Sequence, residues 1–199
     1  MKAMRQLPTS YFSEYADEEI GVRDRSYSAN WRDYGFSRFE DYLRVLDKNY
    51  TSKPNSVFEC GSADGSVIRE LSSRGLEVRG CEFNKGIIKS CDPDTRKRIA
   101  RSNVYEVLNA IPSNSYDCVY ETAAQYIPED YLLEYFQRIH RVVKRDLVIV
   151  LHTQEDDSKP HTGQLNHWPA KKWEDLITSA GFENAFIAKN VPPFYFRKI

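Results

Sequence analysis

The 199 residues, with 41% apolar and 29% charged side chains, have the composition of one globular domain rather than of a disordered chain. A formal net charge of −1 excludes a global basic field that would attract nucleic acid or an anionic membrane. The longest aliphatic run, 147–151, is far shorter than the ~20 residues of a membrane helix. Residues 1–8 lack the apolar stretch of a secretory signal. We therefore expect a soluble protein with no membrane partner.

The four cysteines indicate a reducing compartment. Their spacing contains neither a C-x-x-C pair nor a zinc-ligand pattern, and three of them lie in apolar, strand-like runs where cysteine behaves as a small hydrophobe. Disulfides are the less favoured interpretation. This usage predicts a cytoplasmic location. The cysteines are Cys60, Cys81, Cys91 and Cys118.

Residues 1–55 differ from the rest of the chain because they are rich in aromatic side chains. Part of this segment has the spacing of an amphipathic helix, which would cover one face of a sheet. The segment before it could instead form a cofactor lid and a substrate wall. We therefore predict an aromatic-rich N-terminal cap or lid over residues 1–55. The helically spaced residues are Phe36, Phe39, Tyr42, Leu43 and Leu46.

From about residue 56 onward, strand and helix patterns alternate. This alternation predicts an α/β fold: a three-layer sandwich whose roughly seven-stranded, mainly parallel sheet has helices on both faces. The last two strands are joined through Pro192-Pro193 and should close the sheet as an antiparallel hairpin. The chain is then a single domain, 1–199, with its core at 56–199. The expected strands are 57–60, 76–82, 99–104, 116–121, 147–151, 185–188 and 194–197, and the expected helices are 67–73, 84–90, 131–143 and 173–180.

The first two strands of this core end in residues suited to binding a nucleoside. Segment 59–65, Glu-Cys-Gly-Ser-Ala-Asp-Gly, follows the first strand, and its glycines allow a ligand to approach the backbone closely. The second strand ends in Glu82, whose carboxylate could accept both hydroxyls of a ribose. Gly61 and Glu82 are separated by the ~20 residues expected between a glycine loop and the acid that binds the ribose. This spacing alone fits a nicotinamide site and an S-adenosylmethionine site equally.

Three features favour S-adenosylmethionine over a dinucleotide. Glu59 stands two residues before the first glycine, where it would crowd a pyrophosphate but could accept hydrogen bonds from an ammonium group. The loop lacks G-x-G-x-x-G. No tyrosine is followed four residues later by the lysine that many short dehydrogenases use.

These motifs together resemble those of the class I S-adenosylmethionine-dependent methyltransferases. Segment 57–65 resembles their first motif, E/D-x-G-x-G-x-G, with Ala63 in place of the middle glycine. Glu82 matches the family's ribose-binding acid, and Asn103-Val104 matches the stretch that binds adenine. Residues 116–120 are similar to the F-D-x-V strand. Three later features resemble the family's helix and A-G-F turn: His167-Trp168, Trp173 and Ala180-Gly181-Phe182.

The resemblance implies S-adenosyl-L-methionine as the cofactor and S-adenosyl-L-homocysteine as the product. An acceptor atom would attack the sulfonium methyl in line, so that positioning supplies most of the acceleration. The donor-binding residues expected from the matched positions are Glu59, Cys60, Gly61, Ser62, Gly65, Glu82, Phe83, Asn103, Val104, Glu121 and Thr122.

The acceptor is expected to be a small polar molecule, which could be sugar-like. A general base is useful mainly for a hydroxyl acceptor. His152, at the end of the fifth strand, is the candidate, although a hydrogen bond within its loop is an equal interpretation. A metal cluster around His152 would fit no standard template, so no metal is predicted. The expected acceptor-binding residues are Trp31, Tyr126, His152, His167 and Trp168.

Two other functions stay open at this point. A nicotinamide or nucleotide-sugar enzyme on a related fold would bind a dinucleotide, and a methyltransferase-like partner subunit would catalyse nothing. Nucleic acid is disfavoured by net charge, although the basic run 96–101 could form a local patch; it is more simply the solvated face of a helix. The chain is expected to be a monomer or a homodimer.

Overall fold

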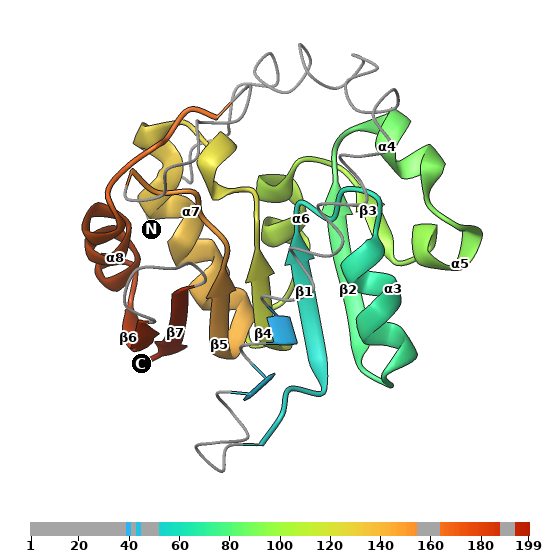
Figure 1. Cartoon of the computed structure of the whole chain (residues 1–199), viewed down its shortest axis with the longest axis horizontal. Helices are drawn as coiled ribbons and strands as arrows, with labels where there is room; N and C mark the ends of the chain where they lie inside the picture. The colour runs from blue at the N-terminus through green and yellow to red at the C-terminus, as the bar shows by residue number, and fades with distance from the viewer. Residues whose placement is uncertain (1–38, 41–42, 45–51, 155–163, 188–193) are drawn as a thin grey trace.

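The computed structural model describes residues 39–40, 43–44, 52–154, 164–187 and 194–199. Its centre is a seven-stranded sheet in the order β3-β2-β1-β4-β5-β7-β6 (Figure 1). Strands β1 to β5 pair in parallel, and β7 pairs antiparallel with both β5 and β6. The strands are Ser56–Cys60 (β1), Glu77–Glu82 (β2), Ile99–Arg101 (β3), Tyr116–Glu121 (β4), Val143–Ile149 (β5), Phe182–Ile187 (β6) and Phe194–Lys198 (β7).

Helices cover both faces of this sheet, so the predicted three-layer fold with its terminal hairpin is confirmed. One apolar cluster contains side chains of α6, α7 and α8, and a second contains side chains of α3 and α4. Adjacent strand residues alternate between these clusters: Val119 faces α7, whereas Tyr120 faces α3. The helices are Ser66–Ser73 (α3), Lys85–Ser90 (α4), Pro93–Arg96 (α5), Val104–Ala110 (α6), Glu129–Val142 (α7) and Ala170–Ser179 (α8), with a 3₁₀ turn at Ala124–Tyr126 (η1).

Two residues of the N-terminal region lie on the α3 face of the sheet. Phe39 is fully buried and meets the ring of Tyr120 edge-on, with the centroids 5.6 Å apart. Leu43 packs against the same cluster while partly exposed. Both residues are helical and belong to the apolar cluster on that face. Within the expected cap or lid, residues 1–38, 41–42 and 45–51, Trp31 among them, lie outside the described part of the chain.

Several element boundaries differ from the sequence prediction. Strand β3 stops at Arg101, because Asn103 caps a helix, α6, that the sequence did not indicate. Strand β5 begins at Val143, directly after α7, although residues 144–146 are charged. Asp146 is 4% exposed within that strand and forms ion pairs with Arg145 and Arg197, which makes its burial tolerable. Strand β6 begins at Phe182, three residues earlier than expected.

Two arginines of α7 hold the end of α6. Arg138 donates to the Asn109 side chain and to the Tyr105 carbonyl oxygen, the latter at 3.3 Å. Arg141 donates to the carbonyl oxygens of Leu108 and, at 2.7 Å, Ile111. The Leu108 carbonyl is among those that a helix end leaves without intrahelical partners. Contacts with α7 therefore add to the Asn103 cap in stabilising a helix as short as α6.

Replacing Arg138 should reveal this dependence. Its side chain is 1% exposed and paired with Glu134. Arg138→Leu leaves several buried acceptors without a hydrogen-bond donor and should lower the free energy of unfolding by about 2–4 kcal/mol. Lys97→Leu removes a cation that is 76% exposed and paired with Asp94, and should change stability little. Urea unfolding followed by circular dichroism measures both. Equal, small effects for the two variants would contradict the role given to Arg138.

Candidate functional site

The loop after β1 curls back over the end of β2. The backbone N–H groups of Gly61 and Ser62 both donate to the carbonyl oxygen of Cys81, at 3.1 and 2.9 Å. Three loop residues have positive φ: Gly61 at 78°, Ala63 at 44° and Gly65 at 71°. For Ala63, the left-handed conformation costs about 1–2 kcal/mol. Its N–H donates to Oε2 of Glu82 at 3.0 Å, which helps to hold it there.

Close packing explains why glycine stands at both ends of this loop. A Cβ at Gly65 would lie 2.3 Å from Cγ2 of Thr95 and 3.0 Å from Cδ1 of Ile99. A Cβ at Gly61 would lie 3.1 Å from Oγ1 of Thr122, on the loop that follows β4. The glycine loop is therefore enclosed by α5 and β3 on one side and by the β4 loop on the other.

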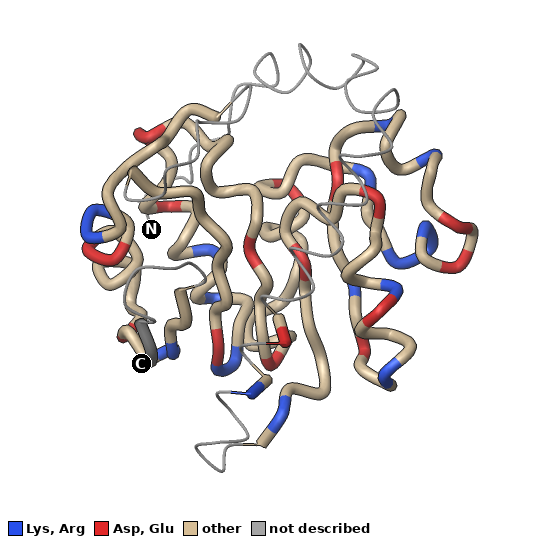
Figure 2. Tube along the Cα trace, in the orientation of Figure 1, with Lys and Arg blue, Asp and Glu red and all other residues tan. Residues whose placement is uncertain are grey.

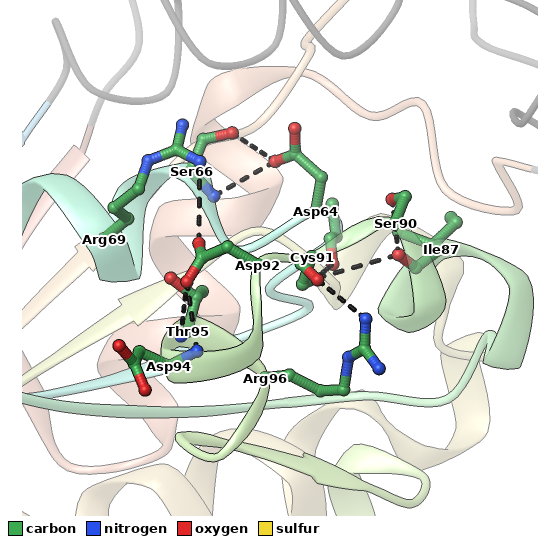
Figure 3. A network of polar contacts seen from close by, with 11 residues as sticks. Asp64, Ser66, Arg69, Ile87, Ser90, Cys91, Asp92, Asp94, Thr95 and Arg96 are labelled. Atoms are coloured by element: carbon green, nitrogen blue, oxygen red, sulfur yellow. Dashed lines mark hydrogen bonds and ion pairs between the residues drawn. The ribbon is translucent and has the colours of Figure 1, made fainter.

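Figure 3 shows the polar network that supports the Gly65 side of the loop. Asp64 accepts hydrogen bonds from the backbone N–H and the hydroxyl of Ser66, at the start of α3. Arg69, on the same helix, lies 3.7 Å from a carboxylate oxygen of Asp92. The other oxygen of Asp92 caps α5 by accepting the N–H groups of Asp94 and Thr95, at 3.1 and 3.0 Å. Helices α3 and α5 are thereby joined beneath Gly65.

Glu82 ends β2 with its carboxylate facing this loop. The side chain is 8% exposed, and burial raises its pKa while the N–H groups of Asn84 and Ala63 lower it. Oε1 accepts from the Asn84 N–H at 2.9 Å, and Oε2 accepts from the Ala63 N–H. The Phe83 N–H also lowers the pKa of this carboxyl group. A carboxylate has about four lone-pair sites, so it can accept further hydrogen bonds, for which hydroxyl groups are suitable donors.

Glu59 is a second buried carboxyl group at this edge. It is 3% exposed, and burial together with the charges of Asp64 and Glu82 raises its pKa well above the usual range. Across the residues that the structure covers, Oε2 of Glu59 has no hydrogen-bond partner. An unpaired buried acceptor is costly, and a ligand cation or N–H donor would remove that cost.

The end of β4 completes the wall of the loop. Oγ1 of Thr122 lies within hydrogen-bond distance of the carbonyl oxygens of Cys60 and Gly61, at 2.9 and 3.0 Å. The preceding residue, Glu121, is fully buried on the opposite face, where it accepts hydrogen bonds from backbone N–H groups and from Tyr135. Cys60 is also fully buried, so its backbone is the part that lies at the loop.

A second group of loops lies at the same edge and is joined through Gln125. Its side-chain Nε2 donates to the carbonyl oxygen of His152 at 2.7 Å, and its backbone carbonyl oxygen accepts the N–H groups of Leu165 and Asn166 at 2.9 and 3.2 Å. Asn166, 2% exposed, donates to the carbonyl oxygen of Ile127. The segments that follow β4 and β5 and precede α8 are thus linked by buried amide groups.

The structure brings the segments of four predicted acceptor-binding residues together through these links. Tyr126 and His152 are half-buried beside the Gln125 contacts. Nε2 of His167 lies 3.0 Å from the carbonyl oxygen of Thr153. The ring of Trp168 packs against Trp173 with centroids 4.7 Å apart, and Lys172 Nζ lies 3.6 Å from its centre. The fifth, Trp31, is outside the described residues.

Asn103 and Val104 lie at the start of α6. Oδ1 of Asn103 accepts the Glu106 N–H at 2.9 Å, which makes Asn103 the N-cap of the helix. Val104 is 6% exposed in the apolar cluster on the α7 side. Phe83, between Glu82 and the N-cap of α4, is half-buried.

The hydrogen bonds that organise the site were not indicated by the sequence. Gln125, Asn166 and Tyr135 form them with residues 14 to 39 positions away along the chain. No local sequence pattern indicates such pairings.

All four cysteines are buried, and none of them forms a disulfide.

Basic side chains of the run 96–101 form contacts with nearby residues. Arg96 donates to the carbonyl oxygens of Lys89 and Cys91, both at 2.8 Å, and Lys97 pairs with Asp94 at 2.9 Å. Figure 2 shows acidic and basic positions interspersed along this part of the trace. Only Pro93–Arg96 is helical, so the run continues past α5 into β3 rather than following one helix face.

Among the described residues, no group of three or more histidine, cysteine or acidic side chains is arranged to hold a metal ion. No helix in the same part of the chain is both long and apolar enough to cross a membrane.

Comparison with known families supports the motif assignment. Residues 58–151 match a family model described as a methyltransferase domain. That range contains the glycine loop, Glu82 and the end of β4. With the seven-stranded topology, it confirms the resemblance to the class I S-adenosylmethionine-dependent methyltransferases. No curated protein matches the sequence.

Solved structures with the same fold have low sequence identity to this chain. A 1,6-didemethyltoxoflavin-N1-methyltransferase from Burkholderia thailandensis, with bound S-adenosylhomocysteine, is 14% identical, with a TM-score of 0.70 over 100% of this chain and 93% of that one. The magnesium protoporphyrin IX methyltransferase from Synechocystis, also with S-adenosylhomocysteine, is 11% identical, with a TM-score of 0.64 over 96% and 94%. A SAM-dependent methyltransferase from Archaeoglobus fulgidus is 17% identical, with a TM-score of 0.61 over 80% and 75%.

Gly65→Ala tests whether the loop depends on close packing at that residue. The new Cβ would meet Thr95, whose N–H belongs to the cap of α5, and we expect unfolding free energy to fall by about 1–3 kcal/mol more than for a control. Gly75→Ala is the matched control, because its φ is also positive, at 87°, but nothing lies within 4 Å of the added Cβ. It should cost only backbone strain, about 1 kcal/mol. Equal losses in urea unfolding would contradict the packing argument.

Proposed function

We propose that this chain, whose residues 58–151 match the methyltransferase domain, is an S-adenosylmethionine-dependent methyltransferase acting on a small polar acceptor, such as a sugar-like molecule. The observation that carries the proposal is the pair of buried carboxyl groups, Glu59 and Glu82, on either side of a glycine loop. One has an oxygen without a partner among the described residues, and the other has lone pairs facing the loop.

Each part of the methyl donor has a matching group in this proposal. Glu82 would accept the two ribose hydroxyls with the lone pairs that Ala63 and Asn84 leave open. Glu59 would face the amino-acid end, whose ammonium group would supply its missing donor. Asn103 would contact adenine through its Nδ2 group, since its Oδ1 caps α6.

The remaining donor residues would act through the backbone and packing. Gly61, Ser62 and Gly65 allow the donor to approach the loop, and Thr122 holds that loop from the β4 side. Val104 would offer an apolar surface to adenine. Phe83 would lie beside the ribose.

The acceptor would lie at the edge formed by the loops that Gln125 joins. Support comes from the polar and aromatic side chains gathered there from separate segments: Tyr126, His152, His167 and Trp168. Methyl transfer requires the acceptor atom in line with the sulfonium, so loops held in fixed positions serve the reaction directly. His152 would accept a proton if the acceptor is a hydroxyl. We place the protein in the cytoplasm, in keeping with its four free thiols.

Parallel calorimetric titrations with S-adenosylmethionine, S-adenosylhomocysteine and NAD test the proposal. Micromolar binding of the two adenosyl ligands without NAD binding is the expected result. Binding of NAD alone would replace the proposal with a dinucleotide enzyme. Binding of none of the three would favour a methyltransferase-like partner subunit.

Glu82→Ala should weaken binding of S-adenosylhomocysteine by about 10–100-fold, because hydrogen bonds from the ribose to a charged acceptor contribute about 1.5–3 kcal/mol. Calorimetry measures the dissociation constants, and circular dichroism verifies that the variants fold. Glu82→Gln keeps one carbonyl acceptor and should give an intermediate loss.

Glu70→Ala is the control for this experiment, since that glutamate lies on α3 with its side chain 46% exposed. It should bind as the wild type does. An unchanged dissociation constant in a folded Glu82→Ala protein would show that the ribose lies elsewhere.

A further inference from the structure

Glu121 is a third buried carboxyl group near the site, and it faces away from the glycine loop. The side chain is fully buried at the end of β4. Residues on β4 alternate between the two apolar clusters, so Glu121 lies on the same face as Val119, toward α7. Its role therefore differs from that of Glu59 and Glu82, which lie beside the loop itself.

The carboxylate of Glu121 determines the path of the chain directly after β4. Oε1 accepts the backbone N–H groups of both Ala123 and Ala124, where η1 begins. Oε2 accepts the hydroxyl proton of Tyr135 on α7. The first residues of the β4 loop are thus fixed to the middle of α7 through one side chain.

That short backbone segment is the outer wall of the glycine loop. A Cβ built on Gly61 would lie 3.2 Å from Cβ of Ala123 and 3.1 Å from Oγ1 of Thr122. The Thr122 hydroxyl lies 3.0 Å from the Gly61 carbonyl oxygen. A shift of a few tenths of an ångström at Ala123 would therefore reach Gly61 directly.

This carboxyl group is costly to the folded protein at neutral pH. Burial raises its pKa from 4.5 to about 7, although hydrogen bonds from the Tyr135 hydroxyl, the Cys60 thiol and the two N–H groups lower it. A raised pKa in the folded state contributes stability that is fully present below pH 4.5 and is lost as pH rises through about 7. A neutral residue of the same shape would avoid this loss, so stability alone does not account for a carboxylate here.

We propose that Glu121 is a positioning residue for donor binding: its carboxylate, held by Tyr135, fixes the N–H groups of Ala123 and Ala124 and thereby the wall against which the Gly61 loop closes. This inference rests on the proposed methyl-donor site. In this arrangement the ionised carboxylate accepts the hydrogen bonds of Tyr135 and of both N–H groups at once, and its protonation weakens the hold on the loop.

The titratable groups that face Glu121 come from three elements, and none of them titrates near pH 7. Burial raises the pKa values of Cys60 on β1, Cys81 on β2 and Tyr135 on α7, each from a starting value of 9 or 10. Tyr105 of α6, stacked on Tyr135, has a raised pKa as well. Glu59 and Glu82 also have raised pKa values, so their contribution must be separated by comparing variants.

Dissociation constants of S-adenosylhomocysteine, measured by calorimetry from pH 5.5 to 8.5, test the inference. For the wild type, part of the gain in affinity with pH should have its midpoint near pH 7, where Glu121 ionises. Glu121→Gln should lose the gain in affinity near pH 7 and keep the pH dependence that Glu59 and Glu82 cause. At pH 8 this variant should bind about 5–10-fold more weakly than the wild type. Tyr135→Phe should bind with an intermediate loss, and Glu70→Gln should match the wild type.

Two readouts that need no ligand accompany the titrations. In ¹⁵N spectra, the Ala123 and Ala124 amide signals should titrate near pH 7 in the wild type and not in Glu121→Gln. The variant should also be more stable than the wild type above pH 7, with the difference vanishing toward pH 4.5.

The outcomes separate this inference from the proposed function. If the wild type binds S-adenosylhomocysteine and folded Glu121→Gln binds it equally at every pH, the positioning role is wrong while the donor site stands. If the wild type does not bind S-adenosylhomocysteine, the proposed donor site is incorrect, and so is the role of Glu121 in donor binding. The amide titration then decides whether Glu121 still holds the β4 loop.

Discussion

The site depends on the attachment of the glycine loop to the end of β2. Three consecutive N–H groups, from Gly61, Ser62 and Ala63, donate to the last two residues of that strand. Because β1 pairs in parallel with β2 on one side and β4 on the other, all three strands end at the same edge of the sheet. The loop is therefore fixed from both sides, and the ligand-facing carboxyl groups are positioned by the sheet itself.

Three carboxyl groups buried within this small region make the edge electrostatically unfavourable in the unliganded protein. Desolvation raises the pKa values of Glu59, Glu82 and Glu121. Backbone N–H groups compensate part of that cost at Glu82 and Glu121, whereas Oε2 of Glu59 lacks a partner among the described residues. Perturbed carboxyl groups gathered in this way are typical of a binding site rather than of a structural core.

Much of this arrangement could be predicted from the sequence because it rests on local patterns. Apolar runs followed by glycine or an acid identified β1 and β2, and the interval between Gly61 and Glu82 indicated their pairing around a ligand. The substitution of Ala63 for the usual glycine is accommodated at a positive φ of 44°, with its N–H on Glu82. The glycine loop and the two strands beside it could therefore be identified from the sequence.

The remainder depended on contacts between distant residues. Helix α6 is stabilised by Arg138 and Arg141 of α7, and no pattern within 104–110 indicates it. The links made by Gln125 and by Glu121 with Tyr135 join residues that only the fold brings together. Even the start of β5 depends on a distant partner, since Arg197 of β7 helps to neutralise Asp146.

A crystal structure of the protein with S-adenosylhomocysteine would show whether Glu82 binds the ribose of the methyl donor. Both ribose hydroxyls should lie within about 2.6–3.2 Å of the Glu82 carboxylate, with the amino group of the ligand beside Glu59. A ligand bound at another edge of the sheet, or one whose ribose does not contact Glu82, would contradict the proposed donor site.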